Sequence, residues 1–325
     1  MLTYLLRRIA YGVLILFGVN LLTFVLFFAV NTPDDMARLN LGGRRVTADA
    51  IESWKAARGL DKPLFYNGDK EGAEKLTDTI FFEKSVPLLA LDFGRSDSGR
   101  DIGYEISTRM WPSLALALPT FVLGLIVMVS WSLLVVFFRR TKVEAAAIGL
   151  SVFLMSISGL FYIIVGQWLF SKVMQIAPVS GWTDGPGMIA FLVLPVLIAL
   201  FSRLGSDTLL YRAMFLEEMG RDYVRTARSK GLTEGEVLRR HVLRNALLPI
   251  ITSSVAVIPM LFMGSLIMEN FFGIPGLGSY TLDALGAQDF SIVRTMVFLG
   301  TLAYIVGLIL TDLVYAWVDP RIRIS

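Results

Sequence analysis

Between two apolar runs the chain carries the sequence SDTLLYRAMFLEEMGRDYVRTARSKGLTEGEVLRRHVLRNALLP, residues 206–249. Ser206 or Asp207 can cap a helix here, and apolar residues then recur at helical spacing. Gly231 ends this pattern, as a C-terminal glycine with positive φ would, and the basic residues just before it suit the last turn of a helix. The first part of the stretch therefore predicts a helix that ends in a tight break.

A second helix is predicted directly after the break. Thr233 and Glu236 match a capping box. The helix runs to Asn245, and Pro249 lies at the mouth of the next apolar run. One interpretation is an amphipathic hairpin lying on anionic lipid. Acidic residues weaken that interpretation and favour a protein partner: Glu217, Glu218, Asp222, Glu234 and Glu236.

The composition is that of a membrane protein. Hydrophobic residues make up 55% of the 325 residues and charged residues 18%, and the charged residues cluster between apolar runs. The net charge of +3 is too small to indicate nucleic-acid binding. The chain has no cysteine. Its single histidine, His241, lies on a charged predicted helix and is expected to be a solvated or interface residue. Disulfides, iron–sulfur clusters and thiolate zinc sites are thus excluded, and no cofactor is implied.

Six runs are apolar enough to cross a bilayer, which takes about 20 residues each. The first is too long for a signal-peptide core and has no cleavage site after it, so it is expected to be a retained helix. The fourth is short and is expected to extend past Arg203 or to start nearer Gly185. The fold class predicted is an all-α polytopic bundle of six transmembrane helices. Its spans cover residues 9–30, 113–138, 145–170, 188–201, 246–268 and 293–318.

The basic residues of the short loops indicate that both termini face the cytoplasm. With that orientation the inner segments hold Arg7, Arg8, Arg139, Arg140, Lys142, Arg321, Arg323 and the dense set between Arg203 and Arg244. The short outer loops hold only Lys172, with Arg294 at the next helix edge. The expected parts are an N-terminal helix (1–30), an external region (31–112) and a five-helix core (113–325) with a cytoplasmic loop (202–245). In the external region, residues 47–58 predict a short helix with Ile51 and Trp54 on one face.

Residues 222–232 resemble the loop of ATP-binding-cassette (ABC) importer permeases that docks on the ATP-hydrolysing subunit, and they resemble most the oligopeptide, dipeptide and nickel branch. The resemblance implies that this EAA loop couples to the ATPase, with Ala227 and Gly231 on its Ala and Gly positions. The coupling residues so implied are Asp222, Tyr223, Arg225, Thr226, Ala227, Arg228, Lys230, Gly231 and Leu232.

Other stretches resemble the same family in the same order: residues 59–64, 91–96, 178–182, 240–249, 272–278 and 319–323. Two features depart from its pattern. Residues 127–138 lack the usual Pro/Gly-rich turn, and residues 63–91 form a longer external loop than usual. These departures concern fine packing and substrate.

The resemblance implies a type I permease in a bacterial inner membrane that works by alternating access. Its partners would be a second homologous permease, one or two ATP-binding subunits, an external solute-binding protein and membrane lipid. No phosphate-binding G-x-x-x-x-G-K-[ST] motif occurs, so ATP hydrolysis is expected on a partner and the chain is not expected to be an enzyme. Two other classes stay open: an ion-coupled secondary transporter, although no halves with matching helix breaks are seen, and a membrane-anchored sensor or assembly protein.

Within the spans, three features could be functional or structural. Asp312 is an intramembrane carboxylate near the inner end of its span, and a structural role is favoured, because a basic residue of the cytoplasmic loop could pair with it. Residues 275–278 could gate or merely turn, and a turn is favoured. Residues 156–159 offer small side chains, for which close helix packing is favoured over a path lining. Spans poor in fixed charge and without histidine favour peptides over free nickel as the substrate.

Overall fold

The computed structural model describes residues 2–42 and 46–318. In that part of the chain all regular elements are helical, and extended backbone pairs only in an isolated bridge between Arg95 and Asp101. The prediction of an all-α fold is confirmed. The terminal stretch with Arg321 and Arg323 lies outside the described residues.

Four described helical segments are long and apolar enough to cross a membrane: Leu6–Val30, Ile102–Phe137, Gly185–Met219 and Phe290–Val314. Two further pairs qualify only together, and each is bent: Lys142–Met155 with Gly159–Val173 by 89°, and Glu234–Val255 with Ile258–Phe272 by 42°. The six predicted spans therefore correspond to four unbroken helices and two broken ones.

The third predicted span, 145–170, is wrong as a single straight helix. It divides into α7 (Lys142–Met155) and α8 (Gly159–Gly166), which continues as a π-helical segment, Gln167–Val173. Ser156 Oγ donates a hydrogen bond to the Val152 carbonyl (2.9 Å), and the backbone of Ser158 is extended. Hydrogen bonds from serine side chains to the backbone compete with the helical hydrogen bonds here. Ser156, Ser158 and Gly159 are exposed, so the close helix packing expected at 156–159 is not found within the chain.

The fourth span extends well past Arg203, as one of the two alternatives predicted. Helix α9 (Met188–Met219) is continuous through Ser206 and Asp207, so the helix start expected there is wrong. Ser206 Oγ donates to the Arg203 carbonyl (3.1 Å) instead of capping, and Arg203 pairs with Asp207 (3.1 Å) along the helix. The helix ends only at Gly220.

The second helix of the hairpin does not stop at Asn245. Helix α11 (Glu234–Val237) continues through a π-helical turn, Leu238–Val242, into α12 (Leu243–Val255), with Pro249 inside it rather than at its mouth. The fifth span then bends at a 3-10 segment, Ile258–Met263, before α13 (Leu266–Phe272). The helix that holds the fifth predicted span, 246–268, thus starts well before residue 246. It is broken at the 3-10 segment, before the predicted end of the span.

The chain divides into two compact units. The first unit holds residues 2–108 and 280–309. Its membrane helix is α1 (Leu2–Phe24), which continues as a π-helical segment, Val25–Val30. Around it are α2 (Pro33–Asn40), α3 (Ala48–Arg58), α4 (Glu74–Thr77), α5 (Ile80–Leu89) and the start of α15 (Phe290–Val318). The predicted helix over 47–58 is confirmed, since Ile51 and Trp54 of α3 are both buried.

The first unit has a small aromatic core. Phe24 is fully buried, with its ring centroid 4.9 Å from that of Phe28, 5.0 Å from that of Phe65 and 5.1 Å from that of Phe81. Such ring pairs stabilise beyond their area alone. The end of the first membrane helix thus anchors the loop helices of the same unit.

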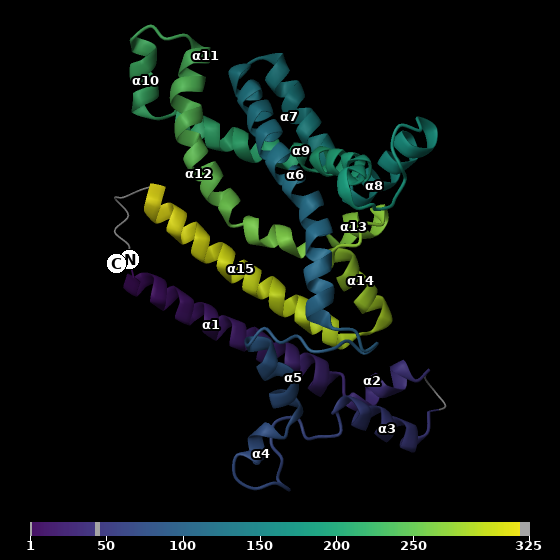
Figure 1. Ribbon diagram of the computed structural model, residues 1–325. Helices are drawn as coiled ribbons and strands as arrows, with labels where there is room; N and C mark the ends of the chain where they lie inside the picture. Colours follow the sequence, from purple (N-terminus) through teal and green to yellow (C-terminus); the bar gives the residue numbers. More distant parts are fainter. Residues whose placement is uncertain (1, 43–45, 319–325) are drawn as a thin grey trace. The chain divides into compact units, whose positions relative to one another are not determined.

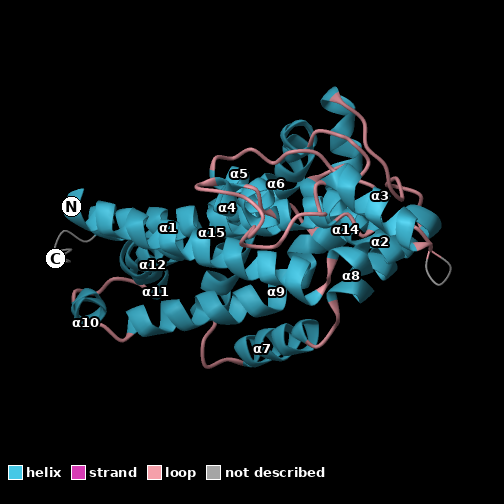
Figure 2. Cartoon of the chain, turned by 90° about the horizontal axis from the view of Figure 1, so that it is seen from below, coloured by secondary structure: helices cyan, strands magenta, loops and turns pink. Residues whose placement is uncertain are grey.

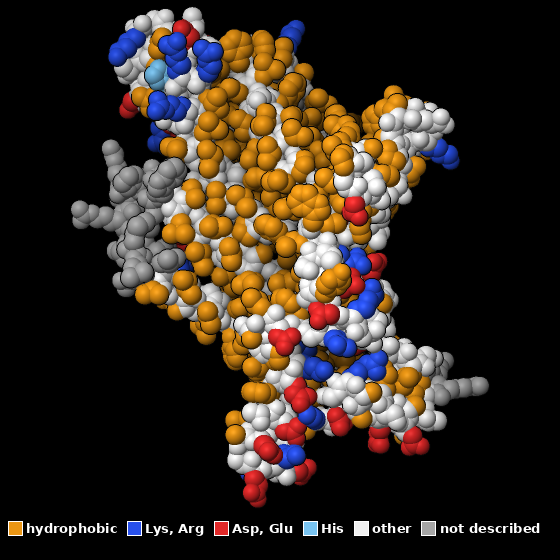
Figure 3. All heavy atoms as spheres, viewed as in Figure 1, with side chains coloured by type: hydrophobic (Ala, Val, Ile, Leu, Met, Phe, Trp, Pro, Cys, Tyr) orange, Lys and Arg blue, Asp and Glu red, His pale blue; other side chains and the backbone are white. Residues whose placement is uncertain are grey.

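The second unit holds residues 109–279 and the end of α15. It contains most of α6 (Ile102–Phe137), then α7 to α13, and it includes the first residues of α14 (Leu277–Ala287). Helices α7 and α9 lie side by side (Figure 2). Figure 3 shows hydrophobic side chains over most of these helices, as expected for surfaces that face lipid.

Candidate functional site

The hairpin of α10 (Asp222–Ser229) and α11 protrudes from the second unit (Figure 1). Gly231 has φ +82°, as its position after α10 predicted. The Gly231 N–H donates to the Arg228 carbonyl (2.9 Å) and the Leu232 N–H to the Ala227 carbonyl (3.4 Å), which is the Schellman pattern. The glycine break between the two helices is confirmed.

The capping box is confirmed as well. Thr233 Oγ1 accepts from the Glu236 N–H (3.4 Å), and Glu236 Oε2 accepts from the Thr233 N–H (3.1 Å). Two amide groups at the start of α11 are therefore satisfied locally. Since the break and the cap are adjacent, the direction of the chain reverses within a few residues.

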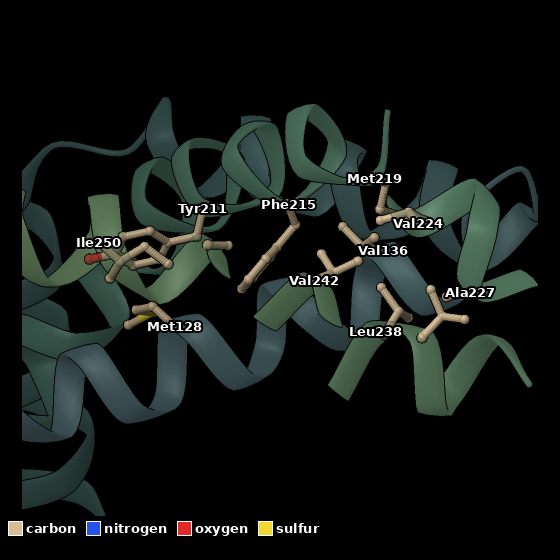
Figure 4. Close-up of a cluster of buried hydrophobic side chains, with 12 residues drawn as sticks. Met128, Val136, Tyr211, Phe215, Met219, Val224, Ala227, Leu238, Val242 and Ile250 are labelled. Atoms are coloured by element: carbon tan, nitrogen blue, oxygen red, sulfur yellow. The ribbon is translucent and has the colours of Figure 1, made fainter. Parts of the chain in front are cut away.

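One face of α10 belongs to the core of the second unit. Val224 and Ala227 are buried. Figure 4 shows them pointing toward Met219 and Leu238. This hydrophobic cluster also contains Met128, Val136, Tyr211, Phe215, Val237, Val242, Ala246 and Ile250. Ala227 thus acts in packing the hairpin onto the membrane helices and is not accessible to another protein.

The opposite face of α10 is open. The Asp222 side chain is 96% exposed and that of Arg225 is 76% exposed, and their contact of 3.7 Å is a surface ion pair of little strength. Lys and Arg side chains gather at this hairpin (Figure 3). The predicted coupling residues that are exposed are Asp222, Arg225, Thr226, Lys230 and Gly231.

Polar contacts brace the hairpin internally. Arg228 Nε donates to Glu234 Oε1 (2.8 Å), and Arg139 lies 3.5 Å from the other oxygen of Glu234. The Tyr223 hydroxyl donates to Glu218 Oε1 (2.5 Å), and burial together with that carboxylate raises the pKa of Tyr223 to about 12. Tyr223 and Arg228 therefore position the exposed face rather than form it.

Six of the nine predicted coupling residues lie on α10 and three, Lys230, Gly231 and Leu232, lie in the break after it. The sequence reasoning did not separate the exposed residues from the structural ones. It also missed Glu218, Glu234 and Arg139 as bracing groups. Glu234 carries a local signal, because an acidic residue directly after a cap interacts well with a helix N-terminus. Arg139 carries none, because it lies on a separate loop. His241, expected to be a solvated or interface residue, is half-buried beside Tyr223, with ring centroids 6.4 Å apart.

A second polar cluster lies in the second unit and was missed. Glu269 in α13 is fully buried. Its Oε1 accepts from Ser113 Oγ (2.8 Å) and the Ser265 N–H (3.0 Å), and its Oε2 from the Ser279 N–H (3.0 Å). Ser113 Oγ in turn accepts from the Leu277 N–H (2.7 Å). The carboxylate thereby ties α6 to the chain after α13.

In the stretch 275–278, Pro275 and Gly276 form the favoured turn, and Leu277 and Gly278 already begin α14. The Gly276 N–H donates to the Ile274 carbonyl (2.8 Å). A Cβ at Gly276 would collide with the Glu269 carboxylate and with Ser113 Oγ, so only glycine allows this approach. The glycines beside an isolated acidic residue are the signal that could have revealed the buried site.

Charged groups also line a cavity of about 170 Å³ in the second unit. Arg203 and Asp207 contribute to it from α9, facing Phe121 and Met128 of α6. Asp312 in α15 is half-buried. Arg203 and Asp207 therefore join Asp312 as ionisable groups of the long apolar helices, and Glu269 lies in the short helix α13. The described residues contain no group of three or more His, Cys, Asp or Glu side chains that could hold a metal ion.

Comparisons with known proteins agree with one another. Residues 113–324 match the model of the family "Binding-protein-dependent transport system inner membrane component", and residues 1–69 match the N-terminal model of the same systems. A Brucella abortus protein named as a peptide transport system permease is 30% identical, with 98% of each chain covered. A Shigella flexneri glutathione transport system permease is 28% identical, with 99% of each chain covered. An oligopeptide transport system permease of Bacillus subtilis is also 28% identical, over 99% of this chain and 100% of its own.

Proposed function

Because the chain belongs to the family of inner membrane components of binding-protein-dependent transport systems, we propose that it is a permease subunit of an ATP-driven importer of peptides or peptide-like solutes. The observation that carries the substrate class is that full-length relatives are named as peptide, oligopeptide, dipeptide and glutathione permeases. The family accounts for the apolar helices and for the polar hairpin between them.

The α10–α11 hairpin is proposed as the coupling element. Its exposed face would dock on an ATP-binding subunit, which would hydrolyse ATP in place of this chain. Coupling requires a contact that differs between two states of the assembly. Asp222, Arg225, Thr226 and Lys230 are free to make that contact, while Val224 and Ala227 carry the movement into the membrane helices. A second homologous permease and an external binding protein would complete the importer.

The substrate class can be tested by uptake competition in cells that carry only this importer. We expect strong inhibition of labelled-peptide uptake by mixed di- to hexapeptides and none by free nickel. A bare metal ion would need His or carboxylate ligands along its route, but His241 lies ahead of the fifth apolar run. Asp207, Glu269 and Asp312 are not part of any group of three or more possible ligands among the described residues. Inhibition by nickel, with none by peptides, would reject the proposal.

The orientation gives a separate prediction. We propose that both termini, residues 139–142 and the hairpin face the cytoplasm, and that residues 31–112 are external. Because the chain has no cysteine, single cysteines report cleanly. The side chains of Ser98 and Ser229 are both exposed in the structure. Whether an impermeant reagent reaches a cysteine at either position should therefore depend only on the side of the membrane on which it lies. In intact cells an impermeant thiol reagent should label Ser98→Cys at least about tenfold more than Ser229→Cys, and the reverse ratio would overturn the orientation.

A further inference from the structure

A cavity of about 350 Å³ lies inside the first unit, beside the ends of two membrane helices. Phe28 lines it from the end of the first helix, and Phe290 and Ser291 line it from the start of α15. The two ends are in contact, since the ring centroids of Phe27 and Phe290 are 5.6 Å apart. The cavity therefore lies where one candidate membrane span ends, at Val30, and another begins, at Phe290.

The charged lining of the cavity is mostly cationic. Arg58, Lys84 and Arg95 line it, and Asp97 is the one carboxylate among its described lining residues. Asp97 is itself crowded by a second carboxylate, because Asp289 Oδ2 accepts from the Asp97 N–H (2.8 Å). Burial lowers the pKa of Lys84, although Glu83 opposes the shift, and burial with Asp289 raises the pKa of Asp97, although Arg58 opposes it from 3.7 Å.

A further cation lies beneath this lining. Arg294 is only 4% exposed, and its guanidinium donates to the Lys84 carbonyl (2.5 Å) and lies 5.0 Å from the Phe28 ring centroid. Its Nε has no hydrogen-bond partner among the described residues. Four cations (Arg58, Lys84, Arg95 and Arg294) thus share this region with Asp97 and Asp289, and Glu83 also acts on Lys84, so the cations outnumber these carboxylates by one.

Arg58 has an unfilled donor at the cavity. Its Nε is buried and finds no hydrogen-bond acceptor in the described part of the chain, since Asp97 Oδ1 is 3.7 Å away. Its guanidinium lies 4.3 Å from the Trp54 ring centroid, so aromatic contact holds it in place. A buried donor without an acceptor is costly, and an oxyanion in the cavity would satisfy it with a charge-assisted hydrogen bond.

We propose that this cavity binds the phosphate headgroup of an anionic phospholipid. The cations supply the charge attraction, Trp54 suits the boundary between headgroups and acyl chains, and Phe28 and Phe290 offer apolar contact. A zwitterionic headgroup would bring another cation into a site that already has an excess of them. The lipid would then fasten the loop helices of the first unit to the bilayer surface.

The test is lipid retention by the full chain, purified with its associated subunits and measured by native mass spectrometry. Mixed phosphatidylglycerol and phosphatidylcholine are the probes. The wild type should retain phosphatidylglycerol selectively, and Lys84→Met should retain about fivefold less, as expected for the loss of one basic contact. Lys84→Arg keeps the charge and should keep the lipid. Lys70→Met is the matched control, because Lys70 lies in the same external region but outside the cavity lining.

Further arms distinguish the sources of the anion. Protection of Lys84 from acylation by phosphatidylglycerol, and not by millimolar glycerol phosphate, supports a lipid site. Equal protection by glycerol phosphate would show a site for free phosphate and overturn the proposal. Displacement of the lipid by dipeptides would make the cavity a peptide site, and equal retention of phosphatidylcholine and phosphatidylglycerol by the wild type would remove the headgroup preference. Each of these two results would also overturn the proposal of an anionic lipid site. Neither would show whether the importer transports peptides.

Discussion

Replacing Gly231 by valine is expected to lower peptide uptake roughly five- to thirtyfold while leaving the chain inserted in the membrane. The residue has φ +82°, and no atom lies within 4 Å of the position that a Cβ would take, so the cost comes from the backbone alone. A β-branched residue in this region costs about 1–2 kcal/mol, which corresponds to that factor in an equilibrium. The measurement is uptake and ATP hydrolysis by the reconstituted importer, where hydrolysis should continue without matching transport.

Two variants separate backbone strain from a general effect of substitution. Gly235→Val places the same side chain four residues later, in α11, where φ is negative and the nearest atom to an added Cβ is Phe137 Cε2 at 3.8 Å. It should transport almost normally. Gly231→Asn should recover much of the uptake, because asparagine tolerates positive φ. Normal uptake by Gly231→Val would reject the assignment of the hairpin as the coupling element.

Replacing Glu269 by alanine is expected to destabilise the chain by about 3–5 kcal/mol. The substitution removes the acceptor for Ser113 Oγ and for the Ser265 and Ser279 amides, and the side chains of Glu269 and Ser113 have no exposed surface. It also leaves a cavity beside Gly276. The melting temperature in detergent should fall on the order of 10 °C, followed by loss of the monodisperse peak in size-exclusion chromatography.

Glu217→Ala is the matched control for this effect. The Glu217 side chain is 73% exposed, and its contact with Arg221 (3.2 Å) is a surface ion pair worth at most about 1 kcal/mol. If the Glu269→Ala and Glu217→Ala variants had the same melting temperature, the Glu269 site would be hydrated in the membrane and would contribute little to stability. Glu269→Gln, which keeps the shape but turns one acceptor into a donor, should lie between the two alanine variants.

The hairpin shows how far sequence reasoning reaches. Gly231, Thr233 and Glu236 act within a few residues of themselves, so their spacing alone predicted the break and the cap. The same reasoning failed at Ser206 and Asp207, which can cap a helix but lie inside α9. A potential cap is overridden when the helix continues into apolar packing, and here Tyr211, Phe215 and Met219 bury one side of it.

The broken spans show a different limit. Hydropathy measures how apolar a run is, and residues 145–170 and 246–268 each fall in a bent helix pair that is long and apolar enough to be a candidate span. It does not measure direction, so the 89° and 42° bends went unpredicted. The serines that end α7 are individually weak signals, because serine is also tolerated inside membrane helices.

The sequence by itself determined the all-α class, the set of apolar segments and the local architecture of the hairpin, since these depend on composition and on neighbours a few residues apart. Only the tertiary structure decided which face of α10 is exposed and which is core. It alone buried Glu269, whose partner Ser113 is 156 residues away in the chain. It also gathered Arg58, Lys84 and Phe290 around one cavity. The physical reason is that burial and hydrogen-bond satisfaction depend on groups that only folding brings together.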